Sequence, residues 1–159
     1  MAVVAAVVGI GAMLPKAHVA TRRARYKQPA EAIWAAITGA QDWRSDISGY
    51  EVLAERDGHR VWRERDKHGQ GILFEEVKAE PPHHLEVRIA DPSLPFGGGW
   101  TYEITQVDGG SYLRVTENGE VYNPIFRFVS RFVMGHAATL EQYLTALGKK
   151  FGEQVTLEE

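Results

Sequence analysis

The sequence predicts one α+β domain in which a strongly curved, seven-stranded antiparallel sheet wraps around a long C-terminal helix and encloses an apolar pocket. Short alternating segments joined by tight turns predict antiparallel strands that are neighbours in the sheet. A single long amphipathic segment follows the last of these strands. Because such a sheet has one apolar face, the final helix is the element available to cover it.

Composition limits the class of protein. A chain of 159 residues fits one domain, and its 44% hydrophobic and 25% charged residues are ordinary for a folded protein. A net charge of −3 supplies no basic surface for phosphates, so we expect no nucleic-acid partner. The absence of cysteine excludes disulfides, thiolate metal ligands and a cysteine nucleophile.

The chain begins with an uncharged apolar run, residues 2–14, that ends at Pro15-Lys16. The run is shorter than the roughly 20 residues that cross a bilayer. A signal peptide begins with basic residues, and none precedes this run. We interpret residues 1–15 as a membrane anchor, either a whole or a truncated transmembrane helix. The alternative is a buried or frayed N-terminal helix. Basic residues follow the run, so an anchored domain would lie on the cytoplasmic side, and an unanchored one would be cytoplasmic.

The first strand and two short helices are expected next. Residues 18–27 alternate as in a strand. Pro29 suits the first position of a helix, because its missing N–H costs little there, and Gly39 suits the helix end. A second short helical turn is expected at residues 42–44.

Six more strands are expected between Gly49 and Val121. Asp57-Gly58 and Asp108-Gly109-Gly110 are typical of hairpin turns, and Pro81-Pro82 separates two strands. Gly97-Gly98-Gly99 leads into a strand rather than a helix, which favours a turn at the cavity rim over a phosphate-binding loop. The expected strands are 50–55, 60–65, 71–80, 84–90, 100–107 and 112–121.

The long helix is expected over residues 124–150, with Asn123 as its N-cap. Apolar residues at helical spacing predict the face that packs on the sheet. The residues expected to be buried on it are Val129, Phe132, Leu140 and Leu144. Residues 16–152 would then form the domain, and residues 153–159 a tail.

Three segments carry a resemblance to a known family: Trp62-Arg63-Glu64, the loop from Ile89 to Gly98, and Glu117-Asn118-Gly119-Glu120-Val121-Tyr122-Asn123-Pro124. From about residue 18 to residue 151 the chain resembles the START-like (SRPBCC) superfamily, the polyketide cyclase/dehydrase and lipid-transport group. The resemblance implies a helix-grip fold with an internal cavity for apolar or amphipathic small molecules. Because members range from lipid carriers to cyclases and hydrolases, it implies the fold more directly than the function.

Strand parity indicates which side chains face the pocket, since alternate residues of a strand share a face. The inward faces are aliphatic and aromatic with a few carboxylates, and we expect Gly119 to mark an irregularity in the last strand. Phe96 is placed where it could gate the entrance. The predicted ligand-binding residues are Trp62, Glu64, Phe74, Glu76, Phe96, Trp100, Tyr102, Glu117, Phe132 and His136.

The pocket carboxylates are the candidates for chemistry. A buried glutamate is either protonated or paired. Glu64, Glu76 and Glu117 could anchor the polar head of a ligand, and Glu64 or Glu117 could act as a general acid or base. The alternative is that each forms a structural salt bridge. The arginines expected for such pairs are Arg63, Arg88 and Arg114.

His136 lies on the apolar face of the long helix and is the third catalytic candidate, because its ordinary pKa is near neutral. The alternative is a core histidine with a hydrogen-bond partner. We expect no metal site, since the other histidines lack cysteines or clustered carboxylates nearby. Arg127 and Arg131, one helical turn apart, suit either an anionic head group or a solvated edge.

We therefore expect non-enzymatic binding, or transport, of a hydrophobic or amphipathic small molecule such as a lipid or a polyketide-like compound, without a cofactor. The absence of a nucleophile–base pair and of a cofactor motif favours this reading. The alternative is a cyclase or dehydratase-like enzyme in which a pocket glutamate or histidine moves protons. A third reading is an interaction domain whose cavity is filled by side chains.

Overall fold

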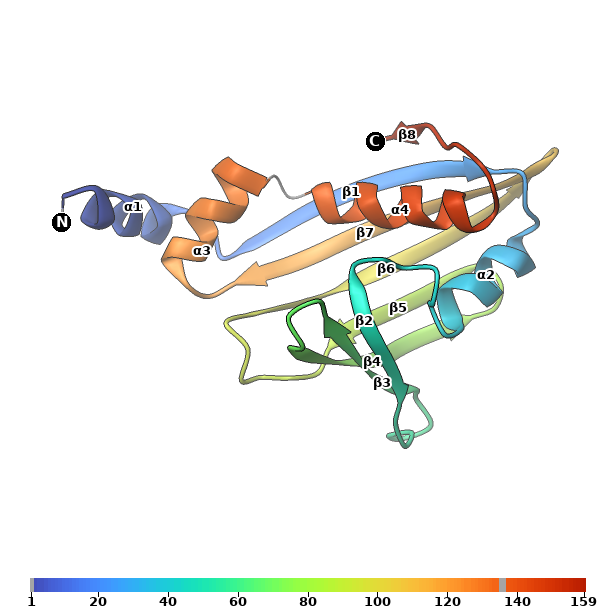
Figure 1. Ribbon diagram of the computed structural model, residues 1–159, viewed down its shortest axis with the longest axis horizontal. Coiled ribbons are helices and arrows are strands. Elements are labelled where there is room, and N and C mark those ends of the chain that lie inside the picture. Colours follow the sequence, from blue (N-terminus) through green and yellow to red (C-terminus); the bar gives the residue numbers. More distant parts are fainter. Residues whose placement is uncertain (1, 135–136) are drawn as a thin grey trace.

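Eight antiparallel strands form a single curved sheet (Figure 1). The computed structural model describes residues 2–134 and 137–159. The order of strands in the sheet is β2-β3-β4-β5-β6-β7-β1-β8. The strands are β1 (Ala17–Tyr26), β2 (Ile47–Val52), β3 (Val61–Asp66), β4 (Gly71–Glu80), β5 (His84–Ile89), β6 (Phe96–Val107), β7 (Gly110–Val121) and β8 (Leu157–Glu158).

Helices lie beside this sheet (Figure 1). The short helix α2 joins β1 to β2, while α4 runs along β1 and β7 in the view of Figure 1. The helices are α1 (Ala2–Met13), α2 (Ala30–Thr38), α3 (Pro124–Val129) and α4 (Ala138–Lys150), with a π-helical turn at Ser130–Met134. The predicted α+β class, with an antiparallel sheet around a C-terminal helix, is confirmed.

The hydrophobic core lies between the inner face of the sheet, α2 and α4. Strand alternation supplies one side: Ala20, Ala24 and Tyr26 of β1 are buried at every second or fourth position. The helical stripe supplies the other, with Leu140, Leu144 and Leu147 of α4 almost fully buried. The Tyr26 hydroxyl donates to the Leu144 carbonyl at 2.8 Å, which joins the first strand to the last helix.

Two elements differ from the expectation at the edges of the sheet. The sheet has eight strands rather than seven, because Leu157–Glu158 pairs with Arg23 and Ala24 of β1. A strand of two residues is too short to show alternation in the sequence. Between β1 and β2 the structure has one helix, α2, and residues 42–43 of the second expected helix form a turn.

The glycine triplet is part of β6 and not a turn. β6 pairs with β7 in continuous register from Phe96↔Val121 to Val107↔Gly110. The glycines permit this pairing, because a Cβ at Gly98 would collide with the Asn118 carbonyl and one at Gly99 with the Val87 carbonyl. Register is also continuous at Gly119 on both sides, so the irregularity expected there is absent.

The single C-terminal helix expected over residues 124–150 is interrupted. Asn123 caps α3 as predicted, its side chain accepting the Ile125 N–H at 2.9 Å. The π-helical turn then changes the angular phase of the helix, so residues beyond it no longer continue the same 3.6-residue stripe. Phe132, expected in the core, lies within this turn and is 60% exposed.

The N-terminal helix α1 packs against α3, at the end of the sheet where β1 begins and β7 ends (Figure 1). The contact is close because Gly11 has no side chain: a Cβ there would overlap the Pro124 carbonyl. None of the core residues comes from α1. Among the helices of the described residues, none is both long enough and apolar enough to cross a bilayer. The membrane-anchor interpretation of residues 1–15 is therefore not supported.

Arg127 holds this junction together from inside. Its buried guanidinium donates to the carbonyls of Val121 and Tyr122 at 2.9 Å, and to those of Gly11 and Leu14 at 3.2 Å. Carbonyls at the C-terminal end of a helix favour a positive charge. Arg127 is thus a structural residue and not part of the exposed arginine pair that its spacing from Arg131 suggested.

Candidate ligand-binding site

A cavity of about 710 Å³ lies between the inner face of the sheet and the C-terminal helical segment. Strands β2 to β7 supply its floor, and residues of α3, the π-helical turn and α4 supply its cover. Most of its lining is apolar or aromatic. The apolar residues include Ile37, Ile47, Ile72, Leu85, Val87, Ile89, Val115, Val121, Val129 and Leu140.

Aromatic rings form one wall of the cavity. Trp62 and Phe74 face each other across the β3–β4 pair, with ring centroids 5.8 Å apart and planes 13° apart. Trp100 of β6 continues the row, 5.8 Å from Phe74, and Tyr50 of β2 lies 6.4 Å from Trp62 on the other side. Rings in direct cross-strand contact stabilise the sheet and leave their remaining edges and faces to the cavity.

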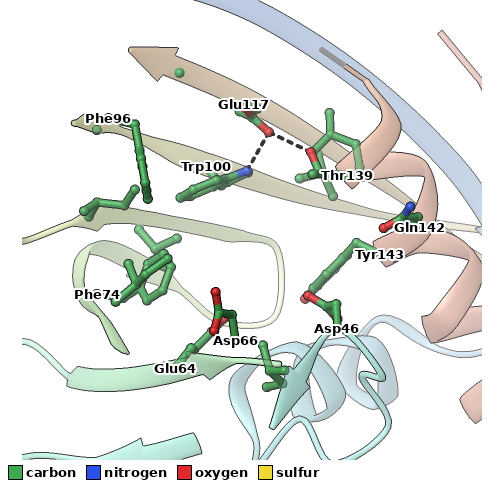
Figure 2. A pocket seen from close by; sticks show the side chains of 18 of the residues that line it. Asp46, Glu64, Asp66, Phe74, Phe96, Trp100, Glu117, Thr139, Gln142 and Tyr143 are labelled. Atoms are coloured by element: carbon green, nitrogen blue, oxygen red, sulfur yellow. Dashed lines mark hydrogen bonds between the residues drawn. The ribbon is translucent and has the colours of Figure 1, made fainter. Parts of the chain in front are cut away.

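Glu117 is the centre of one polar cluster (Figure 2). Its Oε1 lies 3.0 Å from His18 Nε2, and its Oε2 accepts from Trp100 Nε1 and Thr139 Oγ1, each at 3.2 Å. Trp100 lies directly opposite Glu117 in the β6–β7 register. Thr139 belongs to the first turn of α4, where the helix dipole favours a negative charge. The cluster therefore ties three strands to the start of α4.

Glu64 is the centre of a second polar cluster. It is 8% exposed, and its Oε1 accepts from Trp62 Nε1 at 3.2 Å while its Oε2 accepts from Arg44 at 2.9 Å. Arg44 also donates to both carboxylate oxygens of Asp46, at 3.1 and 2.6 Å, and to Gln41 at 2.9 Å. One arginine thus joins the turn after α2 to strand β3.

Electrostatics keep Arg44 and Asp46 of the second cluster charged. Burial acts to raise the pKa of Asp46. The hydrogen bonds and the positive charge of Arg44 lower this pKa by more than burial raises it, so the net pKa lies below its ordinary value. Burial acts to lower the pKa of Arg44, but Asp46 and Glu64 more than compensate, and the net pKa is raised. Both groups are therefore charged near neutral pH.

Tyr102 and Tyr143 lie together inside the cavity, with ring centroids 5.7 Å apart. Burial raises the pKa of both hydroxyls well above its usual range. They therefore remain protonated near neutral pH and can act as hydrogen-bond donors to a bound molecule.

Seven of the ten predicted ligand-binding residues line the cavity: Trp62, Glu64, Phe74, Phe96, Trp100, Tyr102 and Glu117. Glu76 does not; the register of β4 shifts after it, and its carboxylate pairs with Arg60 at 2.7 Å. Phe132 is exposed on the π-helical turn and is not among the lining residues. His136 lies outside the described residues.

The carboxylates have partners, but not the ones expected. Glu64 pairs with Arg44, Glu76 with Arg60, and Glu117 with His18. The expected arginines share strands with the cavity residues but have the opposite parity, so they face outward. On that outer face Arg88 pairs with Glu75 at 2.8 Å and Arg63 with Glu51 at 3.4 Å.

His18 and Arg44 were not predicted as site residues. A signal for His18 exists: it has the same parity on β1 as buried Ala20, and its ring occupies the space that a Cβ at Gly119 would need. Gly119, which suggested an irregularity, thus leaves room for the His18 ring because it has no side chain. Arg44 lies in a turn, where no periodicity indicates which way a side chain points.

The site combines an apolar volume with two polar clusters on its walls. An apolar cavity of this kind can hold an apolar molecule and orient its polar end. A carboxylate–imidazole pair can also transfer a proton to or from a bound carbonyl compound. Among the described residues, no group of His, Cys, Asp and Glu side chains is arranged to hold a metal ion.

Comparisons with solved structures agree with this architecture. Norcoclaurine synthase from Thalictrum flavum has a TM-score of 0.64 at 12% identity, covering 87% of this chain and 88% of that one. Protein MLL2253 from Mesorhizobium loti has a TM-score of 0.62 at 17% identity, with 86% and 96% covered. The di-domain ARO/CYC StfQ from the steffimycin biosynthetic pathway has a TM-score of 0.64 at 11% identity, with 86% and 52% covered. Identities this low establish a shared fold alone.

Sequence comparison identifies the family. Among curated protein sequences, none matches this chain. Residues 17–151, nearly the whole of the domain, match the family model described as polyketide cyclase / dehydrase and lipid transport. The resemblance to the START-like superfamily is thereby confirmed, and the chain belongs to the polyketide cyclase/dehydrase and lipid transport family.

Proposed function

We propose that this protein binds a hydrophobic or amphipathic small molecule, such as a lipid or a polyketide-like compound, in the cavity beneath its C-terminal helical segment. The cavity itself carries the proposal. Its volume of about 710 Å³ falls in the range of small-molecule sites, about 300–1,000 Å³. Its lining is largely apolar and aromatic, with a few polar groups, which is the usual composition of such sites.

The state of the polar groups supports binding over catalysis. Glu64 is held by Arg44 and Trp62, and Arg44 is further occupied by Asp46. Groups locked in this way orient a ligand without reorganising, but they are poorly suited to exchange protons with it. Glu117 and Glu64, on separate walls, would hold the polar end of the bound molecule.

A second candidate function is a cyclase or dehydratase activity, favoured by the contact of 3.0 Å between Glu117 and His18. In an aldol-type ring closure, the pair would take a proton from the carbon beside one carbonyl. The resulting carbanion would attack a second carbonyl, and the alkoxide formed there would take the proton back. The step is balanced without a cofactor. The ARO/CYC proteins among the structural neighbours make this activity worth testing.

Mass spectrometry of the intact protein, purified from its own host under native conditions, tests the binding proposal directly. We expect a co-purifying apolar or amphipathic molecule that is released on unfolding. A matched apolar probe then reports binding, and a cyclisable poly-β-carbonyl compound reports turnover. Finding neither a co-purified molecule nor binding of the apolar probe would refute the proposal.

Glu117→Gln separates the two candidates. If Glu117 only anchors a ligand, the variant should weaken binding by about 1–3 kcal/mol, the range for a charged hydrogen bond, and no protein should show turnover. If Glu117 belongs to an acid–base pair, turnover should fall about 10²–10⁴-fold while probe binding persists. Glu103→Gln is the matched control, because Glu103 is exposed on the outer face of β6. We expect the first outcome.

A further inference from the structure

The charged residues lining the cavity are mostly negative. Among the described lining residues there are five carboxylates and only two arginines, with His18 as the one other basic group. The carboxylates occur on opposite walls: Glu117 lies on β7, whereas Glu64 and Asp66 lie on β3 (Figure 2). Glu120, near the end of β7, is exposed and accepts from the Tyr122 hydroxyl at 2.7 Å. The formal charge of the lining is therefore negative, and a ligand in the cavity lies close to more carboxylates than guanidinium groups.

Neither arginine is available to neutralise an anionic ligand. Arg44 makes four side-chain hydrogen bonds, two to Asp46 and one each to Glu64 and Gln41. Arg60 donates to Glu76 at 2.7 Å and to the Thr38 carbonyl at 2.9 Å. A carboxylate or phosphate could reach a guanidinium only by displacing a protein carboxylate, which would leave that buried charge without its partner.

The start of α4 already has a carboxylate beside it. The N-terminal end of a helix favours an anion through its dipole and its unpaired N–H groups. Here the carboxylate of Glu117 lies beside that end and accepts from the Thr139 hydroxyl of the first helical turn at 3.2 Å, although no side chain caps the backbone N–H groups. A ligand anion at this end of α4 would therefore lie beside a carboxylate of the protein.

What the walls still offer is hydrogen-bond acceptors. An ionised carboxylate has about four acceptor positions. Glu117 uses three of them and Glu64 uses two in the contacts described above. A ligand head group that donates hydrogen bonds can use the remainder, whereas one that only accepts cannot.

We infer that the cavity selects apolar molecules whose polar end is a hydrogen-bond donor, either a protonated amine or an uncharged hydroxyl, and discriminates against anionic amphiphiles such as fatty acids. This inference rests on the proposed function, because it specifies the ligand class of the same cavity. The inferred selectivity depends on the charged residues of the cavity walls, whereas the proposed binding function depends on the apolar volume.

A series of ligands with one chain and different heads tests it. Dodecylamine, dodecanol and dodecanoate are each titrated, below the concentration at which they form micelles, against a neutral fluorescent probe, N-phenyl-1-naphthylamine, bound to the protein. At about pH 8 the amine is cationic and the carboxylate anionic. Like charges brought together disfavour binding, so we expect dodecanoate to bind about 10- to 100-fold more weakly than dodecylamine. Dodecanol, a hydrogen-bond donor without charge, should also bind more tightly than dodecanoate, and its difference from dodecylamine reports the effect of the positive charge.

Variants on the two walls locate the selectivity. Glu117→Gln and Asp66→Asn each remove one negative charge at nearly constant volume, and each should reduce the preference for the amine by about threefold to tenfold. Glu103→Gln removes the same charge from the outer face of the sheet and should leave the preference unchanged. Using both walls keeps the test valid if one variant does not fold.

The outcomes are distinguishable. Equal binding of dodecanoate and dodecylamine, or a preference that both wall variants leave intact, would overturn the charge selectivity and spare the binding proposal. Failure of the probe and of all three compounds to bind would overturn the proposed function, and the selectivity with it. The inference would be established if dodecanol and dodecylamine bind tightly and dodecanoate binds weakly, and if the preference for the amine falls in the two wall variants but not in Glu103→Gln.

Discussion

Arg44 joins residues that are distant in the sequence. Its guanidinium bonds Gln41 and Asp46 in the turn after α2 and Glu64 on β3, and it lies 5.5 Å from the centroid of the Tyr143 ring. Buried charges are tolerated only when each has a partner, so this arginine and Glu64 depend on one another. The turn, the sheet and the C-terminal helix meet at one side chain.

Removing that arginine should destabilise the protein strongly. Arg44→Met leaves Glu64 buried without its countercharge, and we expect the free energy of unfolding to fall by about 3–5 kcal/mol. Urea denaturation measures it. Adding Glu64→Gln should recover part of the loss, because a neutral amide tolerates burial better than an unpaired carboxylate. A double variant no more stable than Arg44→Met would show that the pair is not coupled.

The side chain of His18 illustrates how a neighbouring strand decides what a residue does. Its ring fills the space above Gly119, where any larger residue would collide with it, and so reaches Glu117. Parity alone places His18 on the inner face, but the contact requires that the residue opposite it be glycine. The contact between His18 and Glu117 therefore depends on the pairing of His18 with Gly119, two residues that are far apart in the sequence.

At the scale of elements, the junction of α1 and α3 rests on one glycine and one arginine. Gly11 lets the α1 backbone approach Pro124, and Arg127 bonds the carbonyls at the end of α1. Val3, Ile10 and Met13 remain largely exposed on the outer side of α1. The helix is therefore attached at its C-terminal end while contributing nothing to the core.

Two alanine substitutions in α1 test this attachment. Gly11→Ala should loosen α1, seen as faster amide hydrogen exchange over residues 2–13, while the melting temperature of the domain changes little. Gly9→Ala is the matched control, since a Cβ at Gly9 meets nothing within 4 Å. It should slow exchange slightly, because alanine favours a helix over glycine by about 1 kcal/mol. Equal exchange in the two variants, or a large fall in melting temperature for Gly11→Ala, would contradict the account.

The interruption of the C-terminal helix matters for the cavity. Val129 and Ser130 line it from the α3 side, and Leu140 and Tyr143 line it from α4. A continuous helix would present one stripe to the sheet along its whole length. In the structure two helical segments, α3 and α4, line the cavity instead, and Phe132 of the π-helical turn is exposed.

At the scale of the whole molecule, the curved sheet encloses more space than its side chains fill. The side chains of Trp62, Phe74 and Trp100 are large and could fill the space inside the sheet. Instead, they contact one another in a row along one wall of the cavity. Their mutual packing leaves the volume beneath the C-terminal helical segment unoccupied by protein atoms. The ring row thus shapes a cavity and is not simply core.

A bound apolar molecule should stabilise the fold by mass action. At a free ligand concentration of 100 times Kd the gain is about 2.7 kcal/mol, or about 5–10 °C in Tm for a chain of this size. Thermal denaturation with dodecanol measures it. Ile72→Trp, which places an indole in the cavity, should abolish the shift, whereas Val77→Trp, at an exposed position on the same strand, should keep it. A shift that survives Ile72→Trp would place the ligand elsewhere.

The sequence by itself determined the fold class, because that depends on local patterns. Alternation places Trp62, Glu64, Trp100 and Glu117 on the inner faces of their strands, and the stripe containing Leu140 and Leu144 identifies the covering helix. Such periodicities arise from backbone geometry over a few residues, so they can be read along the chain.

Only the tertiary structure decided which side chains meet. The pairing of Glu64 with Arg44 and of Glu117 with His18, and the docking of Gly11 on Pro124, join segments whose separation follows no period. The same holds for the two-residue strand β8 and the break at Ser130–Met134, which are too short for a pattern. A contact between distant residues depends on the register and curvature of the whole sheet, and no local window of sequence contains that information.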